Sequence, residues 1–260
     1  MRLILNILLS SGLILLSLNL AAAECKDGYG TAKLPDSSVY EGEMKNCLFN
    51  GKGKLTWRDG STFVGHFREG LRDGLGKYIS SAGWTYEGNY DDGIESGLGL
   101  YIFKNGDRYD GEFKNGEFYG KGRFLSKHGD SYQGEFKNGM YDGNGLLKNV
   151  AGDSYEGEFR DGCPNGKGKQ VQASGIIYIG EWKDGKYHGH GVTKFPNGDT
   201  YDGQFANGFW EGQGTLTYAN GDKYVGEFKR GVFDGKGAYH YQTGKAVSGR
   251  WKDGNFMDAQ

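Results

Sequence analysis

The sequence predicts an all-β protein, an elongated and twisted single-layer antiparallel sheet of consecutive 23-residue β-hairpins. Three observations support this fold class. A Tyr-x-Gly triplet recurs every 23 residues, tight-turn signals occur twice in each period, and no window has the periodicity of a helix. The composition agrees, because 49 glycines combined with 15% aromatic residues fit many short strands better than a disordered chain.

The triplets keep one register over nine periods of 23 residues, from Tyr40 to Val247, without insertion or deletion. Phe63 replaces tyrosine in one triplet, and Val247 begins a weaker copy. The tyrosines of the series are Tyr40, Tyr86, Tyr109, Tyr132, Tyr155, Tyr178, Tyr201 and Tyr224. A Gly-x-Gly pair follows most triplets and also occurs at Gly28 and Gly30, one period before Gly51 and Gly53. The array therefore opens with the second half of a unit and closes with the first half of another.

Two turn signals divide each period into two strands. The first is an Asn-Gly or Asp-Gly pair such as Asn115-Gly116, and the second precedes the next tyrosine, as in Asn105-Gly106. Glycine and asparagine adopt positive φ at low cost, which tight hairpin turns require. Each unit is therefore predicted to be one β-hairpin.

One side of the predicted sheet is aromatic, because side chains two residues apart on a strand face the same way. Tyr109, Gly111 and Phe113 share this side, and we expect each ring to lie over glycines of an adjacent unit. Since neighbouring units must supply the cover, rings left partly uncovered would form a binding groove. The predicted aromatic binding face consists of Tyr86, Tyr109, Phe113, Tyr132, Phe136, Tyr155, Phe159, Tyr178, Trp182, Tyr201 and Phe205.

The opposite side is polar. Glutamates such as Glu112 and lysines such as Lys121 occupy fixed places on alternate strands, which predicts cross-strand ladders of opposite charge. A self-neutralising solvated face is the simpler interpretation, and a charged docking surface is the alternative. The formal net charge of −2 provides no field for nucleic acid, so no nucleic-acid partner is expected.

The pattern Tyr-x-Gly-Glu-Phe-x-x-Gly-x-x-x-Gly-x-Gly, as in the unit that starts at Tyr109, resembles the MORN repeat. The resemblance runs from about Cys25 to Gly254. It implies a twisted sheet of hairpins that serves protein association, or else association with a phospholipid membrane. Relatives often join such arrays to catalytic domains, and no segment here would hold one.

The segment 1–23 has the features of a secretory signal peptide. Arg2 precedes a largely apolar run, and three alanines, Ala21 to Ala23, end it. A retained membrane anchor is the alternative, because the run approaches spanning length. The predicted organisation is a signal peptide at 1–23, a half repeat acting as a cap at 24–39, nine repeats at 40–246, and a C-terminal half repeat and cap at 247–260.

An exported chain meets oxidising conditions, so its three cysteines are candidates for disulfide formation. A Cys25–Cys47 bridge is one option if their Cα atoms come within about 7 Å. Cys163 precedes Pro164 in a predicted turn and is interpreted as a free thiol.

No catalytic, cofactor or metal site is predicted. The Gly-x-Gly pairs lie inside hairpins and lack the following helix of a nucleotide-binding loop. His188 and His190 form a His-x-His pair without an evident third ligand. Aspartates after glycine, such as Asp107 and Asp153, are explained by turn chemistry.

The predicted function is that of a non-enzymatic scaffold that binds an unidentified protein partner, or a second copy, in the cell envelope or secretory pathway. Two other functions stay open. One is adaptation to a phospholipid surface, and the other is carbohydrate binding by rows of Trp and Tyr.

Overall fold

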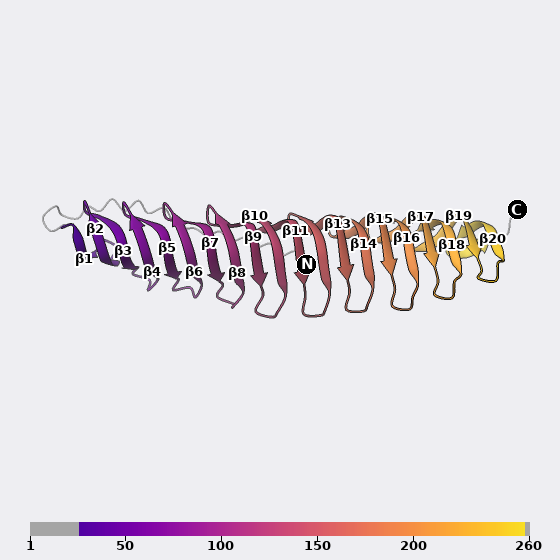
Figure 1. Ribbon diagram of the computed structural model, residues 1–260, viewed down its shortest axis with the longest axis horizontal. Coiled ribbons are helices and arrows are strands. Elements are labelled where there is room, and N and C mark those ends of the chain that lie inside the picture. The colour runs from indigo at the N-terminus through magenta and orange to yellow at the C-terminus, as the bar shows by residue number, and fades with distance from the viewer. Residues whose placement is uncertain (1–25, 258–260) are drawn as a thin grey trace. The chain divides into compact units, whose positions relative to one another are not determined.

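The structure is a computed structural model that describes residues 26–257, and within this range every regular element is a strand (Figure 1). The predicted signal peptide, Cys25 and the last three residues lie outside the described range. The chain forms two compact units, residues 26–140 and 141–257 of the described part.

The first unit contains ten strands. They are β1 (Gly28–Lys33), β2 (Val39–Lys45), β3 (Leu48–Thr56), β4 (Thr62–Arg68), β5 (Leu71–Ile79), β6 (Thr85–Asp91), β7 (Ile94–Ile102), β8 (Arg108–Lys114), β9 (Glu117–Leu125) and β10 (Ser131–Lys137). The remaining strands belong to the second unit, apart from Met140 at the start of β11. They are β11 (Met140–Lys148), β12 (Ser154–Arg160), β13 (Cys163–Val171), β14 (Ile177–Lys183), β15 (Lys186–Lys194), β16 (Thr200–Ala206), β17 (Phe209–Thr217), β18 (Lys223–Lys229), β19 (Val232–His240), β20 (Ala246–Lys252) and β21 (Asn255–Met257).

Within each unit, every strand pairs antiparallel with the strand that follows it in the sequence. In the hairpin β8–β9, for example, Tyr109 lies opposite Phe124 and Gly111 opposite Gly122. The prediction of an all-β array of consecutive hairpins is therefore confirmed.

Two kinds of turn alternate along the array. The short turns place two residues at positive φ, as in Asn115 (φ 53°) and Gly116 (φ 76°) between β8 and β9. Positive φ at both central residues matches the strand twist, which explains the Asn-Gly and Asp-Gly pairs.

The longer turns are held by a backbone bond and an aspartate. Between β7 and β8, the Phe103 amide donates to the Asp107 carbonyl at 2.9 Å. The Asp107 carboxylate then accepts from the Lys127 amide in the next longer turn at 2.8 Å. Asp153, Asp199 and Asp222 make the same contact with the amide 20 residues ahead. These aspartates therefore link successive turns.

A bulge interrupts the complete hairpins within each unit and explains the repeated motif. Opposite Gly111 and Glu112, strand β9 carries two extra residues, Gly120 and Lys121, so the pairing shifts register. The Tyr109 hydroxyl donates to the Glu112 carbonyl at 2.8 Å, and the Glu112 carboxylate accepts from the Lys121 amide at 2.9 Å. Tyrosine and glutamate thus satisfy the backbone groups at the bulge.

The paired glycines make room for the tyrosine ring. An added Cβ at Gly122 would lie within 2.7 Å of three atoms of the Tyr109 ring, and one at Gly111 would lie 2.5 Å from the Gly122 Cα. The ring therefore covers glycines of its own repeat. The expectation that it covers glycines of an adjacent unit was wrong, because the bulge bends the partner strand under the ring of the same hairpin.

Rings supply the contacts between consecutive repeats. Tyr109 stacks on Phe118 at a centroid distance of 3.7 Å and meets Phe113 edge-on at 5.2 Å. Phe136 of the following repeat meets Tyr109 edge-on at 4.9 Å. Within each unit, a hairpin is thus closed by an aromatic side chain of the hairpin that follows it.

The first prediction concerns the tyrosine–glycine contact. Gly122→Ala is expected to destabilise the protein by about 1–3 kcal/mol, because the methyl group must displace the Tyr109 ring from a close-packed site. Urea unfolding followed by tryptophan fluorescence measures the effect. Lys121→Ala is the matched control, since only the backbone of Lys121 takes part in the bulge. Equal stability of Gly122→Ala and wild type would contradict the proposed role of the glycine.

Candidate binding surface

The structure places the predicted aromatic binding face in the interior. None of its side chains is more than 7% exposed. They are Tyr86, Tyr109, Phe113, Tyr132, Phe136, Tyr155, Phe159, Tyr178, Trp182, Tyr201 and Phe205. The prediction that these rings offer a groove to a ligand was wrong, because rings of the same and the next repeat cover them.

Three exposed apolar side chains gather on the other side of the first unit. Val64, Leu75 and Leu98 are 53%, 62% and 66% exposed, and together we call them the leucine surface. They line an open depression of about 530 Å³ together with charged groups that include Lys77, Glu87 and Asp110.

The leucine surface departs from the repeat. Leu75 and Leu98 are the middle residues of two consecutive Gly-x-Gly pairs, where other repeats carry polar residues such as Lys52, Lys121 and Lys167. Sequence reasoning missed these two leucines because it followed what recurs. A search for positions where one repeat differs from the others would have found them.

The predicted charge ladders form only in part. Lys77 and Glu87 on neighbouring strands make such an ion pair at 2.9 Å. Glu43, Glu112 and Glu158 instead accept from the backbone amide at the bulge. These carboxylates therefore contribute to the fold by satisfying a backbone donor at the bulge.

Two charged residues replace aromatic residues in the core of the first unit. In the first and fourth repeats, Phe49 and Phe118 stack on the repeat tyrosine. In the second and third repeats, Arg72 and Glu95 occupy the same position. The Arg72 guanidinium lies 4.7 Å from the Tyr90 ring centroid and donates to the Gly93 carbonyl at 2.6 Å.

Glu95 is 2% exposed, and its Oε2 has no hydrogen-bond partner, like the hydroxyl of the opposing Tyr90. Burial raises the pKa of Glu95, while its own backbone and Arg72 act in the opposite direction. Burial also raises the pKa of Tyr90 well above its usual range. These two unpartnered groups are a local weakness of an otherwise aromatic core.

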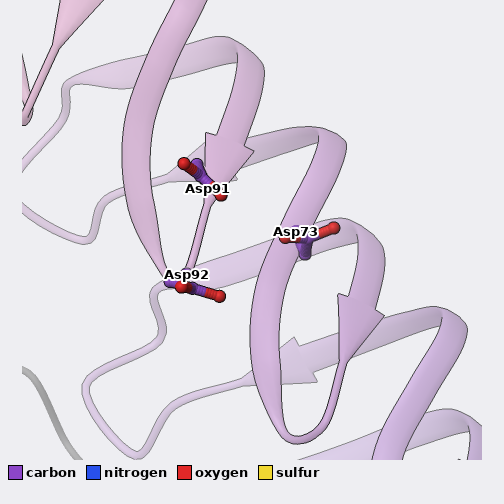
Figure 2. Close-up of side chains that lie close together, drawn as sticks. All are labelled: Asp73, Asp91 and Asp92. Atoms are coloured by element: carbon purple, nitrogen blue, oxygen red, sulfur yellow. The ribbon is translucent and has the colours of Figure 1, made fainter.

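Three carboxylates cluster where the turn after β6 meets β5. Figure 2 shows Asp91 and Asp92 at that turn facing Asp73. In residues 26–257 this is the one group of at least three acidic, histidine or cysteine side chains spaced to hold a metal ion. The Arg68 guanidinium already lies among them, 2.6 Å from Asp73 and 3.4 Å from Asp92. The Arg68 side chain therefore offsets part of the negative charge of the cluster.

The histidine pair and the cysteines form no site of this kind among residues 26–257. His190 Nε2 lies 2.9 Å from an Asp202 carboxylate oxygen, while His188 belongs to no metal-spaced group among the described residues. Cys47 is disulfide-bonded and Cys163 is free. The pairing of Cys47 with Cys25 stays a prediction, because Cys25 lies outside the described residues.

These features define a β-hairpin repeat protein whose rings are internal and whose exposed side varies from repeat to repeat. The sequence model of the MORN repeat matches residues 40–62, 63–85, 86–108, 109–131, 132–154, 155–176, 178–200, 201–223 and 224–246, and the chain belongs to this family. The resemblance inferred from the Tyr-x-Gly pattern is confirmed. No curated protein matches the chain.

Two solved structures are similar to the chain at low identity. The TCP10 domain of Danio rerio CPAP has 11% identity and a TM-score of 0.42, covering 85% of this chain and 100% of that domain. The Drosophila melanogaster SAS-4 TCP domain, solved with a proline-rich motif of Ana2, has 14% identity and a TM-score of 0.35, covering 68% and 90%. Likenesses this weak carry no function to this chain. Among the described residues, no helix has the length and apolarity to cross a membrane.

The second prediction concerns Glu95. Glu95→Gln is expected to raise the free energy of unfolding at pH 8 by about 1–3 kcal/mol, because it removes a buried negative charge whose Oε2 has no hydrogen-bond partner. The raised pKa means that the folded state holds the Glu95 proton more tightly than the unfolded state. Wild type therefore loses stability relative to the variant as pH rises above the unfolded value of 4.5.

Urea unfolding of both proteins at pH 4 and pH 8 measures this difference. Glu87→Gln serves as the control, since Glu87 is exposed and its ion pair with Lys77 is expected to contribute little. A constant difference between wild type and Glu95→Gln across this pH range would contradict the assignment.

Proposed function

We propose that this MORN-repeat chain is a non-enzymatic scaffold that binds a protein partner through the leucine surface. MORN repeats suggest a repeat-based binding or scaffold role. The observation that carries the proposal is the exposure of Leu75 and Leu98 on consecutive repeats, next to the exposed Val64, at a position where the other repeats carry polar or charged side chains. An exposed apolar patch with a polar rim is typical of a protein-binding site.

The geometry favours an apolar segment of a partner protein. The depression is open, and Lys77, Glu87 and Asp110 bring both signs of charge to it. Mixed charges around an apolar centre suit the side chains and backbone of a polypeptide. The backbone of Gly76, Gly88 and Gly99 also lines the depression, so a partner can approach the strands closely.

Two alternatives receive less support. A phospholipid adaptor would need a cationic surface, whereas the formal net charge is −2 and Glu87 and Asp110 flank the leucine surface. A carbohydrate module would need a free tryptophan face. Trp84 is covered on both sides, by Tyr78 at 4.8 Å and Tyr101 at 5.2 Å between ring centroids.

The proposed place of action is the cell envelope or the secretory pathway. The features of residues 1–23 support export, and the disulfide-bonded state of Cys47 is compatible with an oxidising compartment. Fractionation of cells, followed by N-terminal sequencing of the mature chain, tests export and cleavage together. A retained anchor would leave residues 1–23 on the protein.

The third prediction tests the leucine surface. The double variant Leu75→Lys, Leu98→Lys is expected to reduce recovery of the native partner at least about tenfold, since apolar side chains at the centre of an interface carry much of its energy. The fold should tolerate it, because Lys52 and Lys121 occupy equivalent positions in neighbouring repeats. Quantitative affinity purification from the native compartment in mild salt provides the measurement.

Ile179→Lys is the matched control, because Ile179 is 49% exposed on the second unit and lies outside the leucine surface. Wild-type levels of partner with the double variant would refute this site. Absence of a protein partner, together with flotation of the chain on anionic vesicles, would favour the lipid adaptor instead.

A further inference from the structure

Strand β1 has the Gly-x-Gly pair of a complete repeat, Gly28 and Gly30, but no repeat tyrosine lies over Gly30 among the described residues. Among the described residues, β1 pairs with β2 alone. Gly30 on β1 corresponds to Gly53 of the complete repeat, where a tyrosine ring lies over the glycine. An added Cβ at Gly30 would meet only the end of the Met44 side chain. The outer edge of β1 is thus an unpaired strand of the Gly-x-Gly type.

The last long strand shows the complementary state. β20 pairs with β19 over Ala246–Trp251, but on its other side β21 pairs only with Arg250, Trp251 and Lys252. Among the described residues, Ala246 to Gly249 therefore have no strand partner on that side. Gly249 corresponds to Gly42 of a complete repeat, and an added Cβ there would meet only Phe256.

The two open edges are complementary parts of one repeat, Gly28–Lys33 on β1 and Ala246–Gly249 on β20. Val247 to Met257 correspond to the first part of a repeat, and residues 28–39 to the remaining part, so that together they have the 23 residues of one unit. We propose that the chain associates head to tail with a second copy, with β1 of one copy pairing with Ala246–Gly249 of the other. This inference rests on the proposed scaffold function and names one partner for it.

The register follows from the complete repeats. In the hairpin β2–β3, Tyr40 lies opposite Leu55, Glu41 opposite Lys54 and Gly42 opposite Gly53. The same pairing places Val247 opposite Ala32, Ser248 opposite Thr31 and Gly249 opposite Gly30 of the second copy.

The glycines at this joint are the strongest indication. An added Cβ at Gly42 would lie 2.5 Å from the Gly53 Cα, so strands in this register tolerate only glycine at the crossing. Both edges keep the required glycine, although within residues 26–257 no strand lies opposite it on the outer side. Ser248 and Thr31 are exposed and uncharged, so like-charge repulsion does not oppose the pairing.

The completed repeat would lack two interior contacts. Val247 replaces the tyrosine that covers the glycines, and Arg250 replaces the glutamate that binds the bulge amide. The association is therefore reversible and depends on concentration, and the joint is weaker than the hairpins within the chain.

The fourth prediction is a cross-linking test of this register in the full chain. Ser248→Cys and Thr31→Cys are made separately on a Cys163→Ser background and mixed under a mild glutathione couple. Residues directly opposite on antiparallel strands lie about 4.5–5.5 Å apart at Cα, within the reach of a disulfide. The mixture is expected to give at least about fivefold more bridged heterodimer than either variant gives homodimer, because only the heterodimer places the two cysteines directly opposite each other.

Gln133→Cys replaces Ser248→Cys in the control, because Gln133 holds the same exposed repeat position on the interior strand β10. Predominant homodimers would indicate a symmetric contact and overturn the proposal. A wild-type chain that sediments as a monomer over a hundredfold concentration range would also overturn it. Failure here is separable from failure of the scaffold function, because partner recovery through the leucine surface is measured independently.

Discussion

The fold depends on one contact, the tyrosine ring that lies over two glycines of its own hairpin. A bulge bends the strand beneath the ring and frees a carbonyl and an amide. The hydroxyl of the same tyrosine donates to this carbonyl, and the carboxylate of the glutamate three residues after the tyrosine accepts from this amide. Four residues at fixed spacing, the tyrosine, the two glycines and the glutamate, therefore form the bulge, cover it and satisfy its backbone groups. The motif recurs as a unit for this reason.

The aromatic core follows from that contact. Each buried tyrosine ring occupies the same position in its hairpin. In the repeat of Tyr109, one ring of the same hairpin stacks on the tyrosine, and one ring of the same hairpin and one of the next contact it edge-on. Burial raises the pKa of these hydroxyls, to about 12 at Tyr40. At Arg72 and Glu95 the first unit has, in place of stacked rings, a guanidinium over aromatic rings and a buried carboxyl group whose Oε2 has no hydrogen-bond partner.

The periodicity of the sequence was sufficient to predict the strands, both kinds of turn and the family. Tyr109, Gly111 and Phe113 were correctly assigned to one side, because strand geometry fixes alternation. That the rings would be fully covered could not be read from the sequence, since it depends on the bend at Gly120 (φ 60°) and on rings from the next repeat. The leucine surface escaped notice for the opposite reason, because Leu75 and Leu98 depart from the repeat and a search for recurrence passes over them.

The aspartate that links one long turn to the next has a consequence for how such a protein changes over generations. Asp107, Asp153, Asp199 and Asp222 each reach the amide 20 residues ahead, and the ring contacts between hairpins also join nearest neighbours. If the chain gains or loses one whole period, each linking aspartate still lies next to an equivalent amide, and each repeat tyrosine still contacts an equivalent phenylalanine. The array can therefore lengthen or shorten by duplication and deletion in whole periods, while a frame-preserving change of any other size would separate these pairs.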